Sequence, residues 1–364
     1  MAKLKDLAAL GQSPWLDYIR KDLLQTGELA ELVDKGIRGV TSNPTIFENA
    51  IGKSDLYQED IKHLAHQGSD KLQIYEELAV EDIKRAADIL RSVYVQSDET
   101  DGFVSLEVPP DLCDNYENTV LEAKRLWAKI ERPNLMIKVP ATEAGIKAIT
   151  DLIADGISVN ATLMFTRQDY LDVAEAYIKG LEIRHENKLP LDTVASVASI
   201  FVSRMDSAVE SILEGDAKES LLGKVAVANA RQIYREYLNL FQSGRFLRLK
   251  EAGARPQRPL FASTGTKNPQ LSDVLYVDQL IGPDTVNTMP PATMNAFMDH
   301  GTAKRTVDQF SREDDQVMRE CMDAGLDIEA IGADLKQKGL QQFIDSFTSL
   351  LNTVEKRRLE ALGM

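Results

Sequence analysis

The sequence is poor in cysteine and in positive charge, and it lacks long apolar runs. Its two cysteines, Cys113 and Cys321, have no metal-ligand spacing and are too few for a disulfide framework, so a reducing cytoplasm is expected. The net charge of −15 argues against a nucleic-acid partner, because phosphate backbones bind to clustered positive charge. No apolar run approaches the roughly 18 residues that span a bilayer, and residues 1–6 lack the apolar core of a signal peptide. These absences predict a cytoplasmic protein that binds neither nucleic acid nor a membrane.

Motifs for metals and cofactors are also missing. His63 and His66 form an H-x-x-H pattern on a polar helical stretch without a third ligand, which favours a solvated helix face over a metal site. Residues 265–267 (Gly-Thr-Lys) resemble part of a phosphate loop but lack its full G-x-x-x-x-G-K-[ST] spacing. No G-x-G-x-x-G follows a predicted strand, so a nicotinamide cofactor has no support. We therefore expect no metal ion and no cofactor.

The sequence does contain a regular alternation of short β-rich runs and longer helical patterns. The eight predicted strands are residues 16–19, 39–42, 103–108, 135–140, 157–162, 194–202, 259–264 and 285–290. Helical stretches between them include residues 70–97, 115–131, 143–154, 167–187 and 221–241. This alternation predicts parallel strands joined by crossover helices, and eight such units favour a closed (β/α)8 TIM barrel. Counting alone leaves a doubly wound open sheet as the alternative.

Strand signals stop after Gly301, where two further helices are predicted at residues 313–323 and 327–361. The apolar positions of the last stretch are Ile328, Ile331, Leu335, Leu340, Phe343, Phe347, Leu350, Leu351 and Val354. We expect residues 302–364 to form a C-terminal helical extension packed on the barrel. Residues 1–364 would then form a single catalytic domain.

The most informative residue is Lys138, which has only apolar neighbours in the predicted strand 135–140. Removing an ammonium group from water costs free energy, so a lysine in a buried strand needs a physical reason. One reason is chemical: burial favours the neutral amine, which can form a Schiff base with a carbonyl substrate. The alternative is a strand-end lysine that reaches the surface or pairs with a carboxylate. The neighbouring strands decide between these explanations.

Alternate residues of a barrel strand point inward, and active sites lie at the carboxyl ends of the strands. In the predicted fifth strand Ser158, Asn160 and Thr162 share one face, and in the third strand Ser105 and Glu107 do. Further polar or site-lining residues lie at or near other strands: Asp17, Thr41, Asn43, Ser199, Phe201 and Arg204. Mutual hydrogen bonding explains one or two polar groups at a barrel mouth. A lysine, two carboxylates and several amides and hydroxyls from different strands are better explained by a catalytic site.

This combination of groups suits imine chemistry on a polyhydroxylated carbonyl compound. Lys138 would attack the ketone, and the protonated imine would then act as an electron sink for carbon–carbon cleavage. Dehydration needs an acid or base, and cleavage needs a base that takes a hydroxyl proton. Glu107 and Asp17 are two carboxylates that can divide those duties.

Four segments of the chain resemble the transaldolase family. They are Gly39-Val40-Thr41-Ser42-Asn43-Pro44, Ile137-Lys138-Val139-Pro140-Ala141-Thr142, Gly156-Ile157-Ser158-Val159-Asn160-Ala161-Thr162 and Ser199-Ile200-Phe201-Val202-Ser203-Arg204. They follow the family's order and spacing. The resemblance implies a Schiff-base (β/α)8 barrel of the pentose phosphate pathway. Such an enzyme moves a dihydroxyacetone unit from sedoheptulose 7-phosphate to glyceraldehyde 3-phosphate, giving erythrose 4-phosphate and fructose 6-phosphate.

The resemblance also implies roles for individual residues. Lys138 matches the Schiff-base lysine, and Glu107 matches the glutamate that shuttles protons with a water held near Thr162. Asp17 matches the aspartate that takes the proton of the C4 hydroxyl during cleavage. The other matches hold the donor's hydroxyls or the intermediate, line the site, or bind phosphate: Thr41, Asn43 and Asn160, then Ser199 and Phe201, and lastly Arg204.

The chain departs from the family pattern after the seventh strand. Many transaldolases carry a second phosphate-binding arginine there, whereas this chain has Ser263 at a matching position and Lys267 nearby. The resemblance then assigns the second positive charge to Lys267, which keeps the charge but loses the bidentate fork of arginine. The long C-terminal helices resemble the longer bacterial-type branch of the family.

Two other functions are weighed against a transaldolase. The related fructose 6-phosphate aldolase branch releases free dihydroxyacetone, and it has tyrosine and glutamine where Phe201 and Glu107 stand here. A catalytically inactive barrel that binds sugar phosphates has no need of a buried amine such as Lys138. Sugar phosphates are therefore the expected partners. Monomer and homodimer both stay open.

Overall fold

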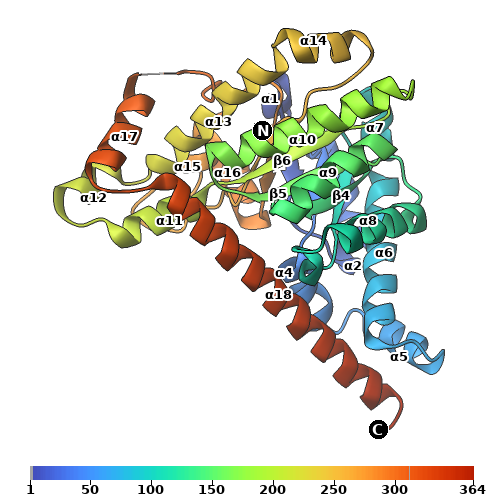
Figure 1. The fold of residues 1–364 in the computed structure, drawn as a ribbon. Helices are drawn as coiled ribbons and strands as arrows, with labels where there is room; N and C mark the ends of the chain where they lie inside the picture. Colours follow the sequence, from blue (N-terminus) through green and yellow to red (C-terminus); the bar gives the residue numbers. More distant parts are fainter. Residues whose placement is uncertain (1–2, 311) are drawn as a thin grey trace.

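Eight parallel strands close into a barrel in the computed structural model, which describes residues 3–310 and 312–364 (Figure 1). Consecutive strands pair in parallel, and β8 completes the ring against β1. The predicted (β/α)8 barrel is confirmed, and the alternative of an open sheet is wrong. The strands are β1 Gln12–Leu16, β2 Gly39–Thr41, β3 Phe103–Glu107, β4 Leu135–Pro140, β5 Val159–Met164, β6 Ser196–Phe201, β7 Arg258–Ala262 and β8 Thr285–Met289.

Helices occupy the connections and surround the barrel (Figure 1). They are α1 Lys3–Ala9, α2 Lys21–Gln25, α3 Glu28–Lys35, α4 Pro44–Phe47, the π-helix η1 Glu48–Gly52, α5 Gln58–His66, α6 Lys71–Ile89, α7 Arg91–Gln96, the 3-10 helix η2 Pro110–Leu112, α8 Tyr116–Ile130, α9 Glu143–Asp155, α10 Arg167–Glu186, α11 Ser203–Ile212, α12 Gly215–Leu221, α13 Val225–Phe241, α14 Gly244–Glu251, α15 Leu275–Gln279, α16 Pro291–His300, α17 Arg312–Asp323 and α18 Ile328–Ala361.

The first strand differs most from its prediction. It ends at Leu16, where the predicted run 16–19 begins. Gln12 and Pro14 hide the strand in the sequence, because neither residue type favours a buried strand interior. In the structure Gln12 is fully buried, and its Nε2 donates to a backbone carbonyl at 2.6 Å. Asp17 therefore follows the carboxyl end of β1 instead of lying within it.

Two other elements differ from their predicted bounds. The predicted helix 70–97 is divided at Leu90 into α6 and α7. Strand β5 begins and ends two residues later than predicted, because the preceding residues still terminate α9. Gly156 adopts a left-handed conformation with φ of 89°, and the amide of Ile157 donates to the carbonyl of Leu152.

The strands β4 and β5 lead into helices that begin with a threonine cap. Thr142 Oγ1 accepts a hydrogen bond from the amide of Gly145 at 3.0 Å. Thr166 forms a reciprocal capping box with Asp169 at the start of α10. Each cap stabilises its helix by about 1 kcal/mol. The two caps hold the carboxyl ends of adjacent strands firmly in place, which is where the predicted site lies.

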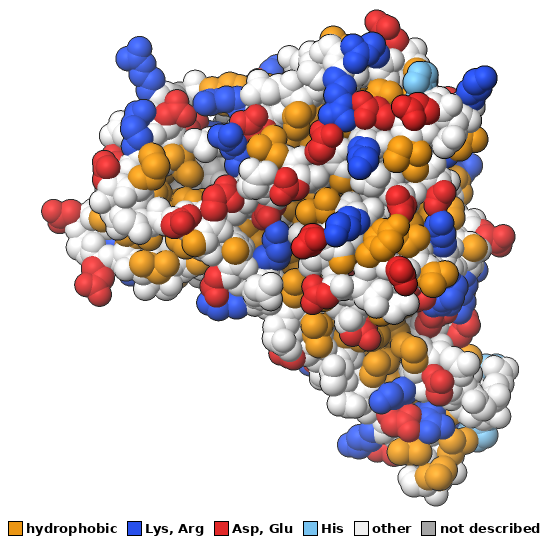
Figure 2. All heavy atoms as spheres, in the orientation of Figure 1, with side chains coloured by type: hydrophobic (Ala, Val, Ile, Leu, Met, Phe, Trp, Pro, Cys, Tyr) orange, Lys and Arg blue, Asp and Glu red, His pale blue; other side chains and the backbone are white. Residues whose placement is uncertain are grey.

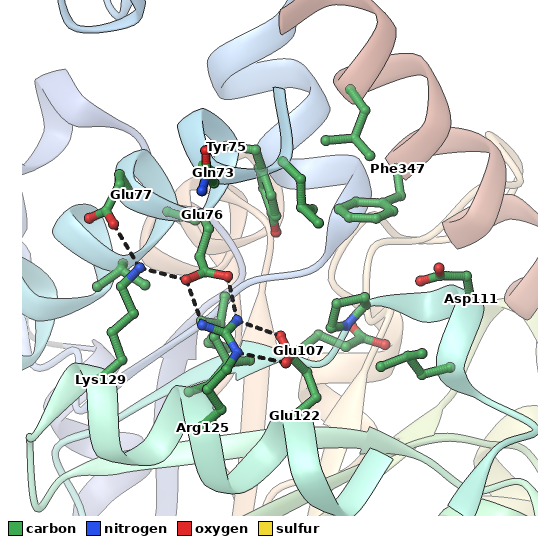
Figure 3. Close-up of a pocket in the computed structure, with 18 residues that line it drawn as sticks. Gln73, Tyr75, Glu76, Glu77, Glu107, Asp111, Glu122, Arg125, Lys129 and Phe347 are labelled. Carbon is green, nitrogen blue, oxygen red and sulfur yellow. Dashed lines mark hydrogen bonds and ion pairs between the residues drawn. The ribbon is translucent and has the colours of Figure 1, made fainter. Parts of the chain in front are cut away.

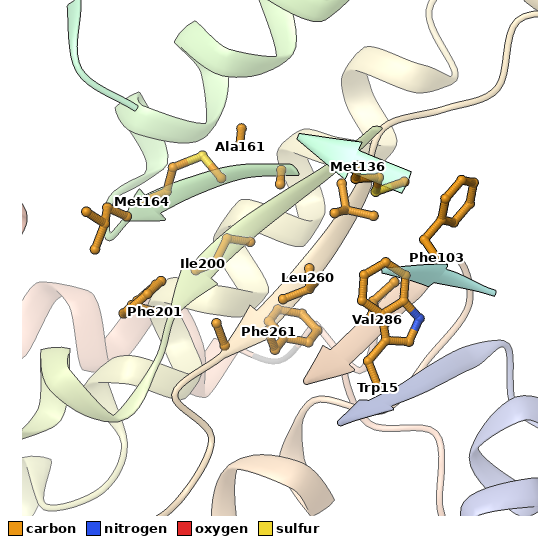
Figure 4. Packing of buried hydrophobic residues seen from close by; sticks show 14 of the residues in the cluster. Trp15, Phe103, Met136, Ala161, Met164, Ile200, Phe201, Leu260, Phe261 and Val286 are labelled. Carbon is orange, nitrogen blue, oxygen red and sulfur yellow. The ribbon is translucent and has the colours of Figure 1, made fainter. Parts of the chain in front are cut away.

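Large apolar side chains fill much of the barrel region around the strands (Figure 4). Trp15 of β1 lies against Phe103 of β3, with ring centroids 6.5 Å apart. The indole also covers Gly39 of β2, where a Cβ would lie 2.4 Å from the ring. Trp15 Nε1 donates to Asp101 Oδ1 at 3.0 Å, so its polar edge is satisfied. This close approach requires glycine at the start of β2.

Helix α18 crosses the molecule and packs on elements from several parts of the chain, among them α5, α4, α11 and β5 (Figure 1). Of the apolar positions predicted for it, Leu340, Phe343, Phe347, Leu350 and Val354 are buried. Ile328, Ile331, Leu335 and Leu351 are only partly buried, because Gly332, Gly339 and Ser346 occupy much of the contact face. The predicted packing of this helix on the barrel is therefore observed.

The assignment of residues 1–364 to one catalytic domain, with 302–364 as its extension, stays a prediction. Met1, Ala2 and Ser311, which fall within that assignment, lie outside the described residues. Among the residues that are described, no helix combines the length and apolar character needed to cross a membrane. Acidic and basic side chains are interspersed over the face shown in Figure 2. The absence of a nucleic-acid partner stays a prediction.

Replacing Gly39 with alanine should destabilise the fold by about 1–3 kcal/mol, because the new methyl group must displace the buried indole of Trp15. The measurement is the urea midpoint of unfolding, followed by tryptophan fluorescence. Gly244→Ala is the matched control, since a Cβ there meets open space at the start of a helix. Equal midpoints for the two variants would contradict the packing described for β1 and β2.

Candidate active site

Lys138 and Glu107 form a buried ion pair at adjacent positions of β4 and β3. The two residues are partners in the strand register, and Lys138 Nζ lies 3.3 Å from Glu107 Oε2. Nζ also donates to the backbone oxygen of Ser42 at 3.2 Å. Both side chains are almost fully inaccessible, at 5% and 2% exposure. The lysine therefore does not reach the surface, and it lies beside a carboxylate inside the barrel mouth.

The next strand brings Asn160 into the same group, because Lys138 and Asn160 are partners in the β4–β5 register. Asn160 Nδ2 donates to Ser105 Oγ at 3.0 Å, and Ser199 Oγ donates to Asn160 Oδ1 at 2.7 Å. Strands β3, β5 and β6 thus contribute side chains to one hydrogen-bonded layer. Ser105, Asn160 and Ser199 are joined as the alternation of polar residues predicts, and their roles in the reaction stay predictions.

Thr162 lies at the carboxyl half of β5, paired in register with Pro140. Its Oγ1 is buried without a hydrogen-bond partner among the described residues. The two carboxylate oxygens of Glu107 are also buried, and their one polar contact there is the ion pair with Lys138. Buried polar atoms normally have partners. These unpartnered oxygens are suited to a bound water or a substrate oxygen.

Asp17 lies on the other side of the mouth, directly after β1. Thr41 Oγ1 donates to Asp17 Oδ1 at 2.7 Å and lies 2.6 Å from Thr288 Oγ1. Thr288 is a site residue that the sequence motifs do not predict. The available signal is its hydroxyl near the carboxyl end of the eighth strand. Together these residues hold the aspartate in one orientation.

Burial shapes the electrostatics of both carboxylates. It raises the pKa of Glu107 and the pKa of Asp17 above the usual carboxyl range, and the positive charge of Lys138 opposes that rise in each case. The hydrogen bond from Thr41 also opposes the rise in the pKa of Asp17. Raised carboxyl pKa values are typical of groups that exchange protons in catalysis.

Asn43 has a structural contact that its sequence position did not reveal. Its Oδ1 accepts a hydrogen bond from the amide of Ile46 at 2.9 Å, so it caps the first turn of α4. The backbone of Pro44, at the first helical position, supports the same start. Contact between Asn43 and a substrate stays a prediction.

Two of the predicted phosphate-binding residues share a cavity. Arg204 of α11 and Lys267 line a space of about 600 Å³ together with Lys338 of α18. The Arg204 guanidinium also lies 5.2 Å from the ring centroid of Phe201. Burial lowers the pKa of Arg204, and the charge of Asp17 opposes that shift. Lys338 pairs with Asp334, which also lines the cavity, so the net positive charge comes from Arg204 and Lys267. A cavity with this charge is suited to an anion.

Ser263 lies near this cavity but is not part of its lining. Its Oγ is 3.0 Å from Ser203 Oγ, and its backbone adopts a left-handed conformation with φ of 55°. Its carbonyl accepts from the amide of Ser203 at the start of α11. The structure thus ties Ser263 to the beginning of the helix that carries Arg204.

A second cavity, of about 620 Å³, borders Glu107 from the side of α6, α8 and α18 (Figure 3). The two cations in its lining pair with carboxylates. Arg125 binds Glu122 and Glu76, and Lys129 binds Glu76 and Glu77. Carboxylates outnumber cations in this lining, so this cavity offers no net positive charge to a phosphate, in contrast to the cavity at Arg204.

Within residues 3–310 and 312–364, no cluster of three or more His, Cys, Asp or Glu side chains has the arrangement of a metal site. His63 and His66 both lie on the polar helix α5. The expectation that the protein needs no metal or cofactor stays a prediction.

The fold and this group of residues define a class. The chain is a (β/α)8 barrel with a buried lysine, two carboxylates and a cationic cavity near the carboxyl ends of its strands, where barrel enzymes carry their active sites. The family model described as Transaldolase/Fructose-6-phosphate aldolase matches residues 14–354. The chain belongs to this family.

Individual relatives agree with the family match. The chain is 46% identical over 359 residues to a transaldolase of Parafrankia, and the match covers 97% of each chain. It is 42% identical over 368 residues to a transaldolase of Trichodesmium erythraeum, again with 97% of each chain covered. It is 43% identical over 351 residues to a transaldolase of Neisseria gonorrhoeae, covering 96% of this chain and 99% of the relative. The resemblance found in the sequence motifs is confirmed along nearly the whole chain.

Proposed function

We propose that this protein is a transaldolase of the pentose phosphate pathway. It transfers a dihydroxyacetone unit from sedoheptulose 7-phosphate to glyceraldehyde 3-phosphate, and it releases erythrose 4-phosphate and fructose 6-phosphate. The observation that carries the proposal is the amine of Lys138, buried 3.3 Å from the carboxylate of Glu107 at the barrel mouth. That amine is the nucleophile for a Schiff base with the ketone of the donor.

Imine formation is assigned to Lys138, Glu107 and Thr162. The amine adds to the donor ketone, and the resulting carbinolamine loses its hydroxyl group as water, which requires a proton donor. Glu107 supplies that proton and takes it back during hydrolysis. A water held between Glu107 and Thr162 would give their buried, unpartnered oxygens hydrogen-bond partners.

Carbon–carbon cleavage is assigned to Asp17. The carboxylate takes the proton of the C4 hydroxyl, the C3–C4 bond breaks, and the bonding electrons move into the protonated imine to give an enamine. Erythrose 4-phosphate leaves as the aldehyde, and the enamine then attacks the aldehyde carbon of glyceraldehyde 3-phosphate. Thr41 fixes the orientation of Asp17, and the raised pKa of Asp17 makes its carboxylate a stronger base.

The other polar residues of the mouth position the substrate. We assign the hydroxyls of the donor and the intermediate to Thr41, Asn43 and Asn160, with Ser199 and Phe201 lining the site. Arg204 binds the phosphate with help from Ser263 and Lys267. Arginine can grip phosphate bidentately, whereas lysine acts as a point charge. Sugar phosphates are the partners, the chain acts as a monomer or homodimer, and it works in the cytoplasm without a metal or cofactor.

Turnover should require an aldehyde acceptor. With sedoheptulose 7-phosphate alone, product formation should stop after about one equivalent per site, because the lysine stays occupied by the three-carbon unit. Adding glyceraldehyde 3-phosphate should restore steady formation of fructose 6-phosphate, measured with a coupled dehydrogenase. Sustained release of dihydroxyacetone at the same rate without an acceptor would identify a lyase instead, and no turnover at all would identify an inactive barrel.

The two carboxylates should act at different steps. Glu107→Gln should slow formation and hydrolysis of the imine, and Asp17→Asn should chiefly slow carbon–carbon cleavage. Each loss should be about 10²–10⁴-fold, the usual contribution of a general acid or base. Rapid-quench single-turnover experiments separate these steps by measuring trapped imine and released erythrose 4-phosphate. Both variants stalling at the same step would contradict the division of labour.

Arg204→Ala should raise KM for phosphorylated donors by about 10–100-fold, the scale of one lost hydrogen-bonded charge pair. The same variant should use unphosphorylated fructose with nearly unchanged kcat/KM, because that sugar has no phosphate to lose. Steady-state kinetics with the matched pair fructose 6-phosphate and fructose measures the contrast. An equal loss on both sugars would assign Arg204 to the architecture of the site and not to phosphate binding.

A further inference from the structure

Helix α18 passes over Lys138, and Phe343 is the residue of this helix that faces the lysine. The centroid of the Phe343 ring lies 5.8 Å from Lys138 Nζ, within the range of a cation–π contact. Phe343 and Lys138 are both buried. Nζ is therefore bordered by the Glu107 carboxylate, the backbone oxygen of Ser42 and the ring of Phe343.

Glycines allow the helix to approach the barrel mouth this closely. A Cβ on Gly339, about one turn before Phe343, would lie 2.9 Å from the side chain of Leu163 and 3.5 Å from Arg204 Nη1. A Cβ on Gly332 would lie within 2.1 Å of the Thr166 side chain. Glycine inside a helix is unfavourable because it loses more conformational freedom than other residues. Two glycines on one face of α18 are explained by the close approach of this helix to the barrel that they permit.

Polar contacts hold α18 in place on both sides of Phe343. Lys336 Nζ donates to the backbone oxygen of Ala141 at 3.0 Å and pairs with Asp169. Beyond Phe343, Ser346 Oγ lies 2.9 Å from Thr45 Oγ1 in α4. The helix is thus anchored about two turns before Phe343 and about one turn after it.

We propose that Phe343 is a specificity-determining residue, which shields the enamine on Lys138 from protonation by water and thereby favours transfer over loss of free dihydroxyacetone. The product imine is still hydrolysed by the water assigned to Glu107 and Thr162. The inference rests on the proposed function, because it concerns the fate of that enamine. Hydrolysis begins once C3 of the enamine is protonated. Water then adds to the imine carbon, the carbon–nitrogen bond breaks, and free dihydroxyacetone and the lysine ammonium remain. The ring offers no hydrogen bond to a water above the nitrogen, and its face attracts the protonated imine.

The experiment compares two rates in the same enzyme preparation. One is the release of free dihydroxyacetone from fructose 6-phosphate without an acceptor, and the other is transfer to erythrose 4-phosphate. Phe343→Leu should raise the ratio of hydrolysis to transfer roughly fivefold, as expected for loss of one partly desolvated cation–π contact. Phe343→Met, which keeps most of the volume without a ring, should raise the ratio as well. The ratio does not depend on the fraction of folded enzyme.

Leu350→Ala is the control, because Leu350 is fully buried on the same helix but packs toward η1, near Gly52. This variant loosens α18 without touching Lys138, and it should leave the ratio within about twofold of the wild-type value. An unchanged ratio in both Phe343 variants would overturn the inference, and so would an equal rise in Leu350→Ala. If the wild-type enzyme formed no imine that borohydride traps, the proposed function itself would fail, and this inference with it.

Discussion

The buried ion pair between Lys138 and Glu107 is the interaction on which the rest of the site depends. Burying two charged groups costs several kcal/mol each, and their attraction offsets that cost only in good geometry. The barrel supplies the geometry through strand register, since the two residues are direct partners on β4 and β3. The same enclosure that makes the pair costly keeps the amine away from bulk water. An arrangement of this kind is better explained by chemistry than by stability.

The groups around the pair are sorted by charge and by strand. Uncharged amides and hydroxyls from β5 and β6 lie next to the lysine, where added charge would disturb it. Asp17 accepts a hydrogen bond from Thr41 of β2, whose hydroxyl in turn contacts Thr288 of β8. The cations lie further out, in the cavity of Arg204 and Lys267, whose third cation, Lys338, comes from α18. The acidic protein thus gathers positive charge where an anionic substrate would need it.

Much of the fold was predictable because the alternation of strands and helices repeats eight times and each repeat reinforces the others. Seven of the eight strands overlapped their predictions along most of their length, and β1 did not, since Gln12 and Pro14 conceal it. The alternation of polar residues placed Ser105, Asn160 and Ser199 correctly on one layer. Contacts between distant segments were not predictable in this way. The contact of Thr288 with Thr41 and the ring of Phe343 over Lys138 both depend on tertiary packing, which local periodicity does not encode.

The most direct test of the central claim is reduction with borohydride in the presence of fructose 6-phosphate, followed by peptide mass mapping. We expect a three-carbon adduct on Lys138, and no adduct when this residue is replaced by arginine. A permanent adduct on a different lysine, or none on the active wild-type enzyme, would contradict the assignment of Lys138 as the Schiff-base nucleophile.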